Sequence, residues 1–149
     1  MKKLFFALMI IFALTSSPYF SEAKSLKKPV VLDSDEWIVT LDEARIEEGE
    51  QLYKGDSRAD VYLLKIANKK GKKHNVTVHT FRKEQGKSYK FGMSLNDTEG
   101  RNIEIEDKEV ISFKNFPVGK ETEEFEVFIM WQEEGSGRFF KQDFLVPVR

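Results

Sequence analysis

Few side chains of this protein are suited to catalysis. The chain contains no cysteine and only two histidines, His74 and His79. Thiol chemistry is therefore excluded, and a serine nucleophile would need one of these histidines as its base, although no Gly-x-Ser-x-Gly turn is present. Side chains alternate between the faces of a strand, so a spacing of five puts the two histidines on opposite faces if both lie in one strand. We expect no metal site and no cofactor, because a zinc site needs several converging ligands.

Acidic residues are numerous, but their spacing matches no known site. The stretch NDTEGRNIEIED, residues 96–107, resembles a calcium loop in composition. The calcium pattern would put its first ligand at Leu95, which cannot coordinate a cation, so we expect a hairpin turn instead. Adjacent carboxylates such as Glu123 and Glu124 point to opposite faces of a strand. The sequence therefore predicts a non-catalytic protein, and a hydrolase that uses a carboxylate pair is the less favoured alternative.

Four lysines surround Gly71 and could bind a polyanion, such as teichoic acid or anionic lipid headgroups. They are Lys69, Lys70, Lys72 and Lys73. If the strands near 61–67, 75–83 and 87–95 form a meander, these lysines lie together at one end of a sheet. No aromatic residue interleaves with them, so we expect no nucleic-acid binding. The alternative is a solvated tip whose lysines discourage pairing between sheet edges.

The first residues predict export. A basic start at Lys2 and Lys3 precedes eleven consecutive apolar residues, 4–14, and a polar tract that ends with Ser21-Glu22-Ala23. This is the pattern of a secretory signal peptide, and the apolar run is too short to span a bilayer. We expect a signal peptide over 1–23, a flexible segment over 24–32, one domain over 33–149, no transmembrane segment in the mature chain, and secretion to the medium or loose association with the envelope. The lack of cysteine favours a bacterial source.

Hydrophobic residues alternate with polar ones along most of the chain, which is typical of half-buried strands. The alternating sets are Trp37 to Leu41, Tyr62 to Ile66, Val76 and Val78, Tyr89 to Leu95, Ile103 and Ile105, Phe125 to Trp131, and Phe140 to Val148. Turn signals separate them at Asn68–Gly71, Gln85–Gly86, Asn96–Gly100, Phe116–Gly119 and Glu134–Gly137. The pattern predicts an all-β fold, an antiparallel immunoglobulin-like β-sandwich of about 7–9 strands. Only 42–51 has helix-forming composition, and it fits a short helical turn or another strand.

Three stretches carry a resemblance to a known class. They are VYLLKIANKKGKKHNVTVHTF, YKFGMSLNDTEGRNIEI and FPVGKETEEFEVFIMW, within residues 61–131. Their succession of strand, polar hairpin, Asp-x-x-Gly hairpin and Pro-x-Gly turn resembles small exported immunoglobulin-like sandwiches of Gram-positive bacteria. The resemblance implies an extracellular adhesion, regulatory or interaction module.

The strand at 125–132 is apolar on both faces. If Glu134 to Gly137 form the tip of a hairpin, Trp131 pairs with Phe140 and Val127 with Phe144, which joins the core-facing sets of both strands. The opposite face then carries four large apolar side chains, Phe128, Met130, Phe139 and Leu145. Two interpretations stay open: the face is covered within the chain, for example by Pro29 to Leu32 or a crossing loop, or it binds a partner.

The sequence thus predicts a secreted, non-catalytic interaction module that binds a protein or an envelope polyanion. Phe128, Met130, Phe139 and Leu145 are the candidate partner-binding residues, and the four lysines around Gly71 are the candidate polyanion-binding residues. The alternative is a structural or matrix protein that self-assembles as a homo-oligomer through its apolar strand faces.

Overall fold

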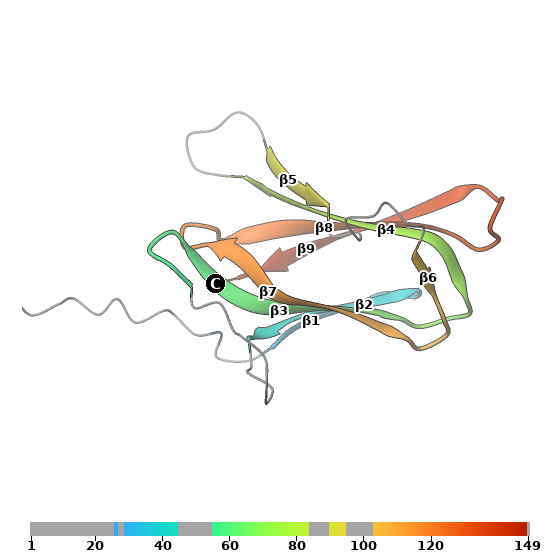
Figure 1. The fold of residues 1–149 in the computed structure, drawn as a ribbon, viewed down its shortest axis with the longest axis horizontal. Helices are drawn as coiled ribbons and strands as arrows, with labels where there is room; N and C mark the ends of the chain where they lie inside the picture. The colour runs from blue at the N-terminus through green and yellow to red at the C-terminus, as the bar shows by residue number, and fades with distance from the viewer. Residues whose placement is uncertain (1–25, 27–28, 45–54, 84–89, 95–102, 149) are drawn as a thin grey trace, which may run out of the picture.

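The computed structural model describes residues 26, 29–44, 55–83, 90–94 and 103–148, and all regular elements within this part are strands. The predicted all-β class is therefore confirmed (Figure 1). The strands are β1 (Val30–Asp33), β2 (Trp37–Glu43), β3 (Ala59–Asn68), β4 (Lys73–Lys83), β5 (Lys90–Ser94), β6 (Ile103–Ile105), β7 (Val110–Gly119), β8 (Glu124–Gln132) and β9 (Phe139–Pro147).

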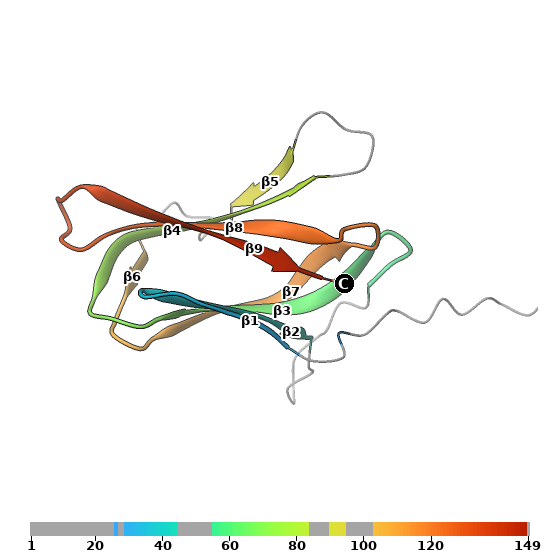
Figure 2. The same ribbon diagram turned by 180° about the vertical axis from the view of Figure 1, so that it is seen from behind.

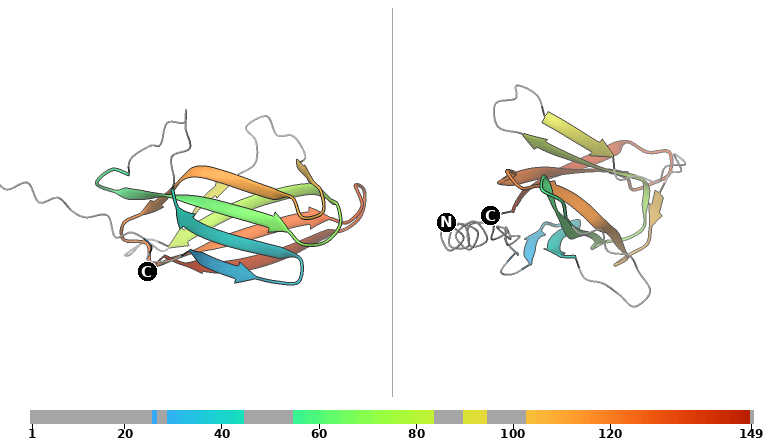
Figure 3. Two further views of the ribbon diagram at one scale, coloured as in Figure 1. Left: turned by 90° about the horizontal axis from the view of Figure 1, so that it is seen from below. Right: turned by 60° about the vertical axis from the view of Figure 1, so that its left-hand side comes forward.

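Eight strands form two antiparallel four-stranded sheets that pack face to face, with strand orders β1-β2-β3-β7 and β5-β4-β8-β9. The short β6 pairs with the start of β4 at one end of the sandwich. Figures 1 and 2 show the two layers from opposite sides, and Figure 3 shows that their strands run in similar directions, as in aligned sheet packing. The predicted antiparallel β-sandwich is confirmed.

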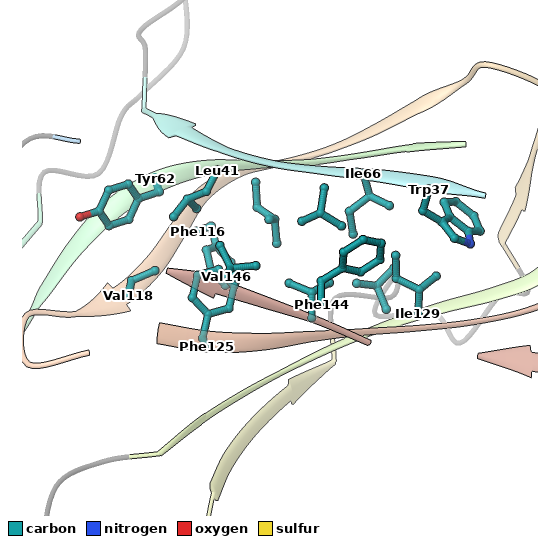
Figure 4. Close-up of a cluster of buried hydrophobic side chains, with 14 of the residues drawn as sticks. Trp37, Leu41, Tyr62, Ile66, Phe116, Val118, Phe125, Ile129, Phe144 and Val146 are labelled. Atoms are coloured by element: carbon teal, nitrogen blue, oxygen red, sulfur yellow. The ribbon is translucent and has the colours of Figure 1, made fainter. Parts of the chain in front are cut away.

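The core lies between the sheets because the alternating apolar residues of both sheets point inward. Trp37, Leu41 and Ile66 from one sheet meet Ile129 and Val146 from the other (Figure 4), and each of these side chains is buried. The Trp37 and Trp131 rings meet edge to face, with centroids 5.5 Å apart. Burial of this kind contributes about 1.5 to 3 kcal/mol per large aliphatic side chain.

Two strands, β7 and β1, include residues that the sequence does not predict to be in strands. The predicted turn at Phe116–Gly119 is wrong, because these residues form the end of β7. β7 is the edge strand of its sheet, and Pro117 is exposed on it. Proline is tolerated at such an edge because its missing N–H group removes no hydrogen bond to a neighbouring strand. The start of the sandwich also differs: Val30 to Leu32 belong to β1, so the predicted boundary at residue 33 falls inside that strand.

The predicted meander is also wrong for its first pair of strands. β3 lies in one sheet and β4 in the other, so the turn between them bridges the two layers. The buried Asn68 side chain stabilises this crossover by donating to the carbonyl oxygens of Gly71 and Glu106. β4 and β5 do pair as antiparallel neighbours.

Some predicted features lie outside the described residues. They are the signal peptide over 1–23, the turns at Gln85–Gly86 and Asn96–Gly100, and residues 45–51 of the segment with helical composition; Asp42 and Glu43 of that segment belong to β2. No helix among the described residues is long and apolar enough to span a bilayer.

Candidate functional site

The β5-β4-β8-β9 sheet has one face toward the core and one toward solvent. The regular register between β8 and β9 pairs Trp131 with Phe140 and Val127 with Phe144, as predicted. We call the solvent side of β4, β8 and β9 the outer face. Its side chains are Thr77, His79 and Phe81 of β4, Glu126, Phe128 and Met130 of β8, and Phe139, Lys141, Asp143 and Leu145 of β9.

All four predicted partner-binding residues lie on the outer face. Phe139 and Leu145 are each 53% exposed, and they are among the most exposed large hydrophobic side chains of the described chain. Phe128 and Met130 are half-buried between them in the neighbouring strand. The sheet therefore presents aromatic and aliphatic groups to solvent on its outer side.

Of the interpretations left open, coverage of this face by Pro29 to Leu32 is wrong. Val30 to Leu32 pair with β2 in the opposite sheet, where Val30 and Leu32 pack against the core. Phe128 is instead half-buried by neighbours on its own face. The His79 ring centroid lies 6.3 Å from that of Phe128, and the Lys141 ammonium lies 5.6 Å from the Phe128 ring.

His79 and Phe81 extend the apolar surface onto β4. Their ring centroids are 6.4 Å apart, and His79 lies beside Phe128 in the ladder. The predicted partner-binding residues do not include these two side chains of β4. A signal was present, because His79 and Phe81 have the opposite parity to the inward-facing Val76 and Val78.

A bulge changes the predicted placement of the two histidines. His74 lies opposite Gln132 and His79 opposite Phe128, and these partners are four residues apart on the regular strand β8. Both histidines therefore lie on the same side of the sheet, and the prediction of opposite faces is wrong. The extra residue is Asn75, whose backbone has a positive φ of 50°. Within the described part of the chain, no group of three or more acidic or histidine side chains could hold a metal ion.

The four lysines around Gly71, which we call the lysine tip, are paired with carboxylates. The partners come from the end of β1, the turn that follows it, β6, and the residues directly after β6 and β8. The pairs are Lys69–Asp33, Lys70–Glu36, Lys72–Glu104, Lys72–Glu106, Lys73–Glu36 and Lys73–Glu133. A polyanion would have to displace these carboxylates. The predicted polyanion site stays a prediction that this geometry does not favour.

Lys73 is the buried member of the lysine tip, with 2% of its side chain exposed. Its ammonium lies 2.8 Å from carboxylate oxygens of both Glu36 and Glu133, and 5.9 Å from the Trp131 ring. Burial alone would lower the pKa of Lys73, but hydrogen bonds to Glu133 and Glu36 outweigh it and raise that pKa. Burial likewise opposes the charge of Glu133, yet hydrogen bonds from Lys73 and Trp131 lower its pKa. Lys73 and Glu133 are therefore both charged at neutral pH, and their charges compensate each other.

The opposite end of the sandwich holds a groove of about 690 Å³. Its charged lining includes Asp56, Arg58, Arg82, Lys120 and Glu121. The backbone N–H groups of Arg58 and Ala59 donate to Asp56 at 2.7 and 2.9 Å. Together with the Arg58 guanidinium, these bonds hold the pKa of Asp56 below its ordinary value. A general acid requires a raised pKa, so Asp56 is better explained as a turn-stabilising residue.

Comparison with known proteins agrees with the predicted export. A model of YozF-like secreted proteins matches residues 22–149. The chain is also similar to the uncharacterized protein YozF of Bacillus subtilis (strain 168), with 25% identity over 97% of this chain and 95% of that protein. None of the solved structures matches the chain. Since the family match covers the whole sandwich, this protein belongs to the YozF-like secreted protein family, and the predicted secretion is confirmed.

Proposed function

We propose that this secreted protein is a non-catalytic interaction module that binds a protein partner through the outer face. The observation that supports the proposal is the exposure of Phe139 and Leu145, each 53%, on a face that also carries Phe128 and Met130. Soluble monomers seldom expose contiguous large apolar groups without a binding role. Phe128 and Met130 are suited to be the central anchors, because half-buried side chains are already held in place before a partner binds.

The composition of the outer face favours a protein over an anionic polymer. It combines aromatic rings, a methionine and one pair of unlike charges, Lys141 and Asp143, with side-chain atoms 3.9 Å apart. Aromatic residues and methionine are enriched in protein interfaces, whereas a polyanion is bound by an excess of cations. The cations of the lysine tip already have carboxylate partners.

A catalytic role has less support. The described residues contain no metal-ligand cluster, and the groove residue Asp56 has a lowered pKa. Neither observation resembles the converging carboxylates of raised pKa that a hydrolase would need.

The test is capture of the partner with purified mature protein as bait. Bait carrying Phe128→Ser and Met130→Ser should lose a partner that wild-type bait retains from the envelope or culture supernatant of the native host. A matched control is bait with Val31→Ser and Val110→Ser, which removes exposed aliphatic side chains, 58% and 49% exposed, from strands of the other sheet. This control should capture the partner as wild type does.

Thermal unfolding of each bait separates lost binding from lost folding. A folded Phe128→Ser/Met130→Ser variant that captures the same proteins as wild type would contradict the proposal. Capture that ignores this variant but disappears with Lys70→Glu and Lys72→Glu would transfer the binding site to the lysine tip.

A further inference from the structure

β9 has an open edge within the described part of the sandwich. It is the last strand of the β5-β4-β8-β9 sheet and pairs with β8 on one side only. The Val148 N–H donates to the Glu123 carbonyl at 2.8 Å, and the register of β9 contains no shift. Because backbone groups alternate in direction along a strand, the N–H and C=O groups of Lys141, Asp143 and Leu145 point to the open edge.

The side chains along this edge are chemically symmetric. The sequence Phe139-Phe140-Lys141-Gln142-Asp143-Phe144-Leu145 has Gln142 at its centre, unlike charges on either side of it, and apolar residues beyond them. The exposed members of this set are Phe139, Lys141, Asp143 and Leu145. An edge with such symmetry matches itself when it is rotated by a half turn.

We propose that a second copy of this chain pairs with the open edge of β9 in antiparallel orientation, on a twofold axis at Gln142. This register places Lys141 opposite Asp143 of the second copy, twice, and Phe139 opposite Leu145, twice. A twofold-symmetric interface repeats every contact in this way. Unlike charges and apolar pairs directly opposite each other stabilise an antiparallel ladder.

Charge selects this register over its neighbours. The outward-pointing residues must pair with one another, so the twofold axis moves in steps of one residue. An axis at Lys141 would put the two Lys141 ammonium groups opposite each other, and an axis at Asp143 would do the same with two carboxylates. Both arrangements place like charges together, which destabilises a sheet.

Two features that could obstruct pairing lie outside its path. Pro147 lacks an N–H group, but it follows the paired stretch 139–145. The Gln142 side chain accepts a hydrogen bond from Ser34 Oγ at 3.1 Å and so is turned toward the interior. The inference goes beyond the proposed function, since the dimer would place two outer faces side by side in one continuous sheet.

Charge exchange tests the register in purified protein by sedimentation equilibrium at low salt. Wild type should dimerise, and Lys141→Asp or Asp143→Lys alone should raise the dimer dissociation constant about tenfold or more, because each change creates two like-charged pairs. The double variant Lys141→Asp/Asp143→Lys should recover wild-type affinity. Wild type that stays monomeric, single variants that dimerise normally, or a double variant that does not recover would each overturn the proposal.

Cross-linking tests the twofold axis independently. Because the chain has no cysteine, Gln142→Cys introduces one thiol at the predicted axis, where residues of a pair without backbone hydrogen bonds lie close enough for a disulfide. Oxidation should give a covalent dimer. The matched control is Ser112→Cys, an exposed position on β7, the edge strand of the other sheet, which should stay monomeric. A covalent dimer from Ser112→Cys but not from Gln142→Cys would overturn the proposed edge. Neither measurement requires the protein partner, so failure of the dimer and failure of the proposed function are distinguishable.

Discussion

The side chains of the lysine tip are paired within the fold, whereas the apolar side chains of the outer face remain exposed to solvent. Every cation of the tip has a carboxylate neighbour, and Lys73 is almost fully buried between Glu36 and Glu133. On the outer face, Phe139 and Leu145 remain about half exposed to solvent. Charged groups that look available for ligands are therefore committed to the fold, whereas apolar groups that look suited to the core are exposed. Variants at the tip should change stability, and variants on the face should change association.

The sharpest contrast lies within β9. Phe144→Ala removes a ring that is 8% exposed and should cost about 3 to 5 kcal/mol of unfolding free energy. Leu145→Ala removes a side chain that is 53% exposed and should cost about 0.5 kcal/mol. Urea unfolding followed by tryptophan fluorescence measures both values. Equal costs would show that the outer face is covered in solution.

Lys73→Ala should produce the next largest loss of stability. Removing one member of a buried ion pair costs about 3 to 5 kcal/mol, and we expect about 2 to 3 here because Glu133 is 46% exposed and can be rehydrated. Lys72→Ala is the matched control at the same tip, and it should change the urea midpoint far less, since the Lys72 side chain is 40% exposed. Equal stability of the two variants would show that Lys73, like Lys72, is solvated and that its ion pairs do not stabilise the fold.

The two Asn bulges explain part of what sequence reasoning misses in the fold, namely the parity of side chains along β4 and β7. Strict alternation identifies β2, β3, β8 and β9, and the length of the Glu134–Gly137 tip gives the β8–β9 register. In β7, Asn115 has a positive φ of 57°, and the inward-facing Phe113 and Phe116 are three residues apart instead of two. Asn75 has the same effect in β4. An extra residue at positive φ shifts the parity of a strand, and no local pattern reveals it in advance.

The candidate site is predictable only in part for a different reason. The apolar residues of the outer face follow from parity along β8 and β9, so Phe128, Met130, Phe139 and Leu145 could be identified. The carboxylates that neutralise the lysine tip lie 32 to 60 positions away in the sequence, for example Glu133 for Lys73. Charge counting along the chain cannot detect partners that only the sandwich brings together.

Acid should weaken the ion pair between Lys73 and Glu133. The pKa of Glu133 is lowered in the folded protein, so its contribution to stability is present above its ordinary value of 4.5 and is lost as pH falls through the lower folded value. The pKa of Lys73 is raised, so its contribution is lost only above pH 10.5. Wild type should therefore be more stable than Glu133→Gln at pH 7, by about 1 kcal/mol for a partly exposed pair. The difference should shrink below pH 4.5, and a constant difference from pH 7 to pH 3 would contradict the ionic role of Glu133.

The smallest expected effect separates the exposed lysines from Lys73. Lys69, Lys70 and Lys72 are 31%, 60% and 40% exposed, so their ion pairs are screened by solvent. Replacing all three by Gln should leave the protein folded, with a much smaller loss of stability than Lys73→Ala alone, and should leave partner capture by the outer face unchanged. Hydrogen bonds to Glu104 and Glu106 raise the pKa of Lys72. Water solvates an exposed ammonium group almost as well, so these bonds should add little to the stability of the fold. Binding of teichoic acid by wild type, lost in the triple Gln variant and weakened by salt, would show that the tip releases its carboxylates for an external anion and would reverse the assignment of the two regions.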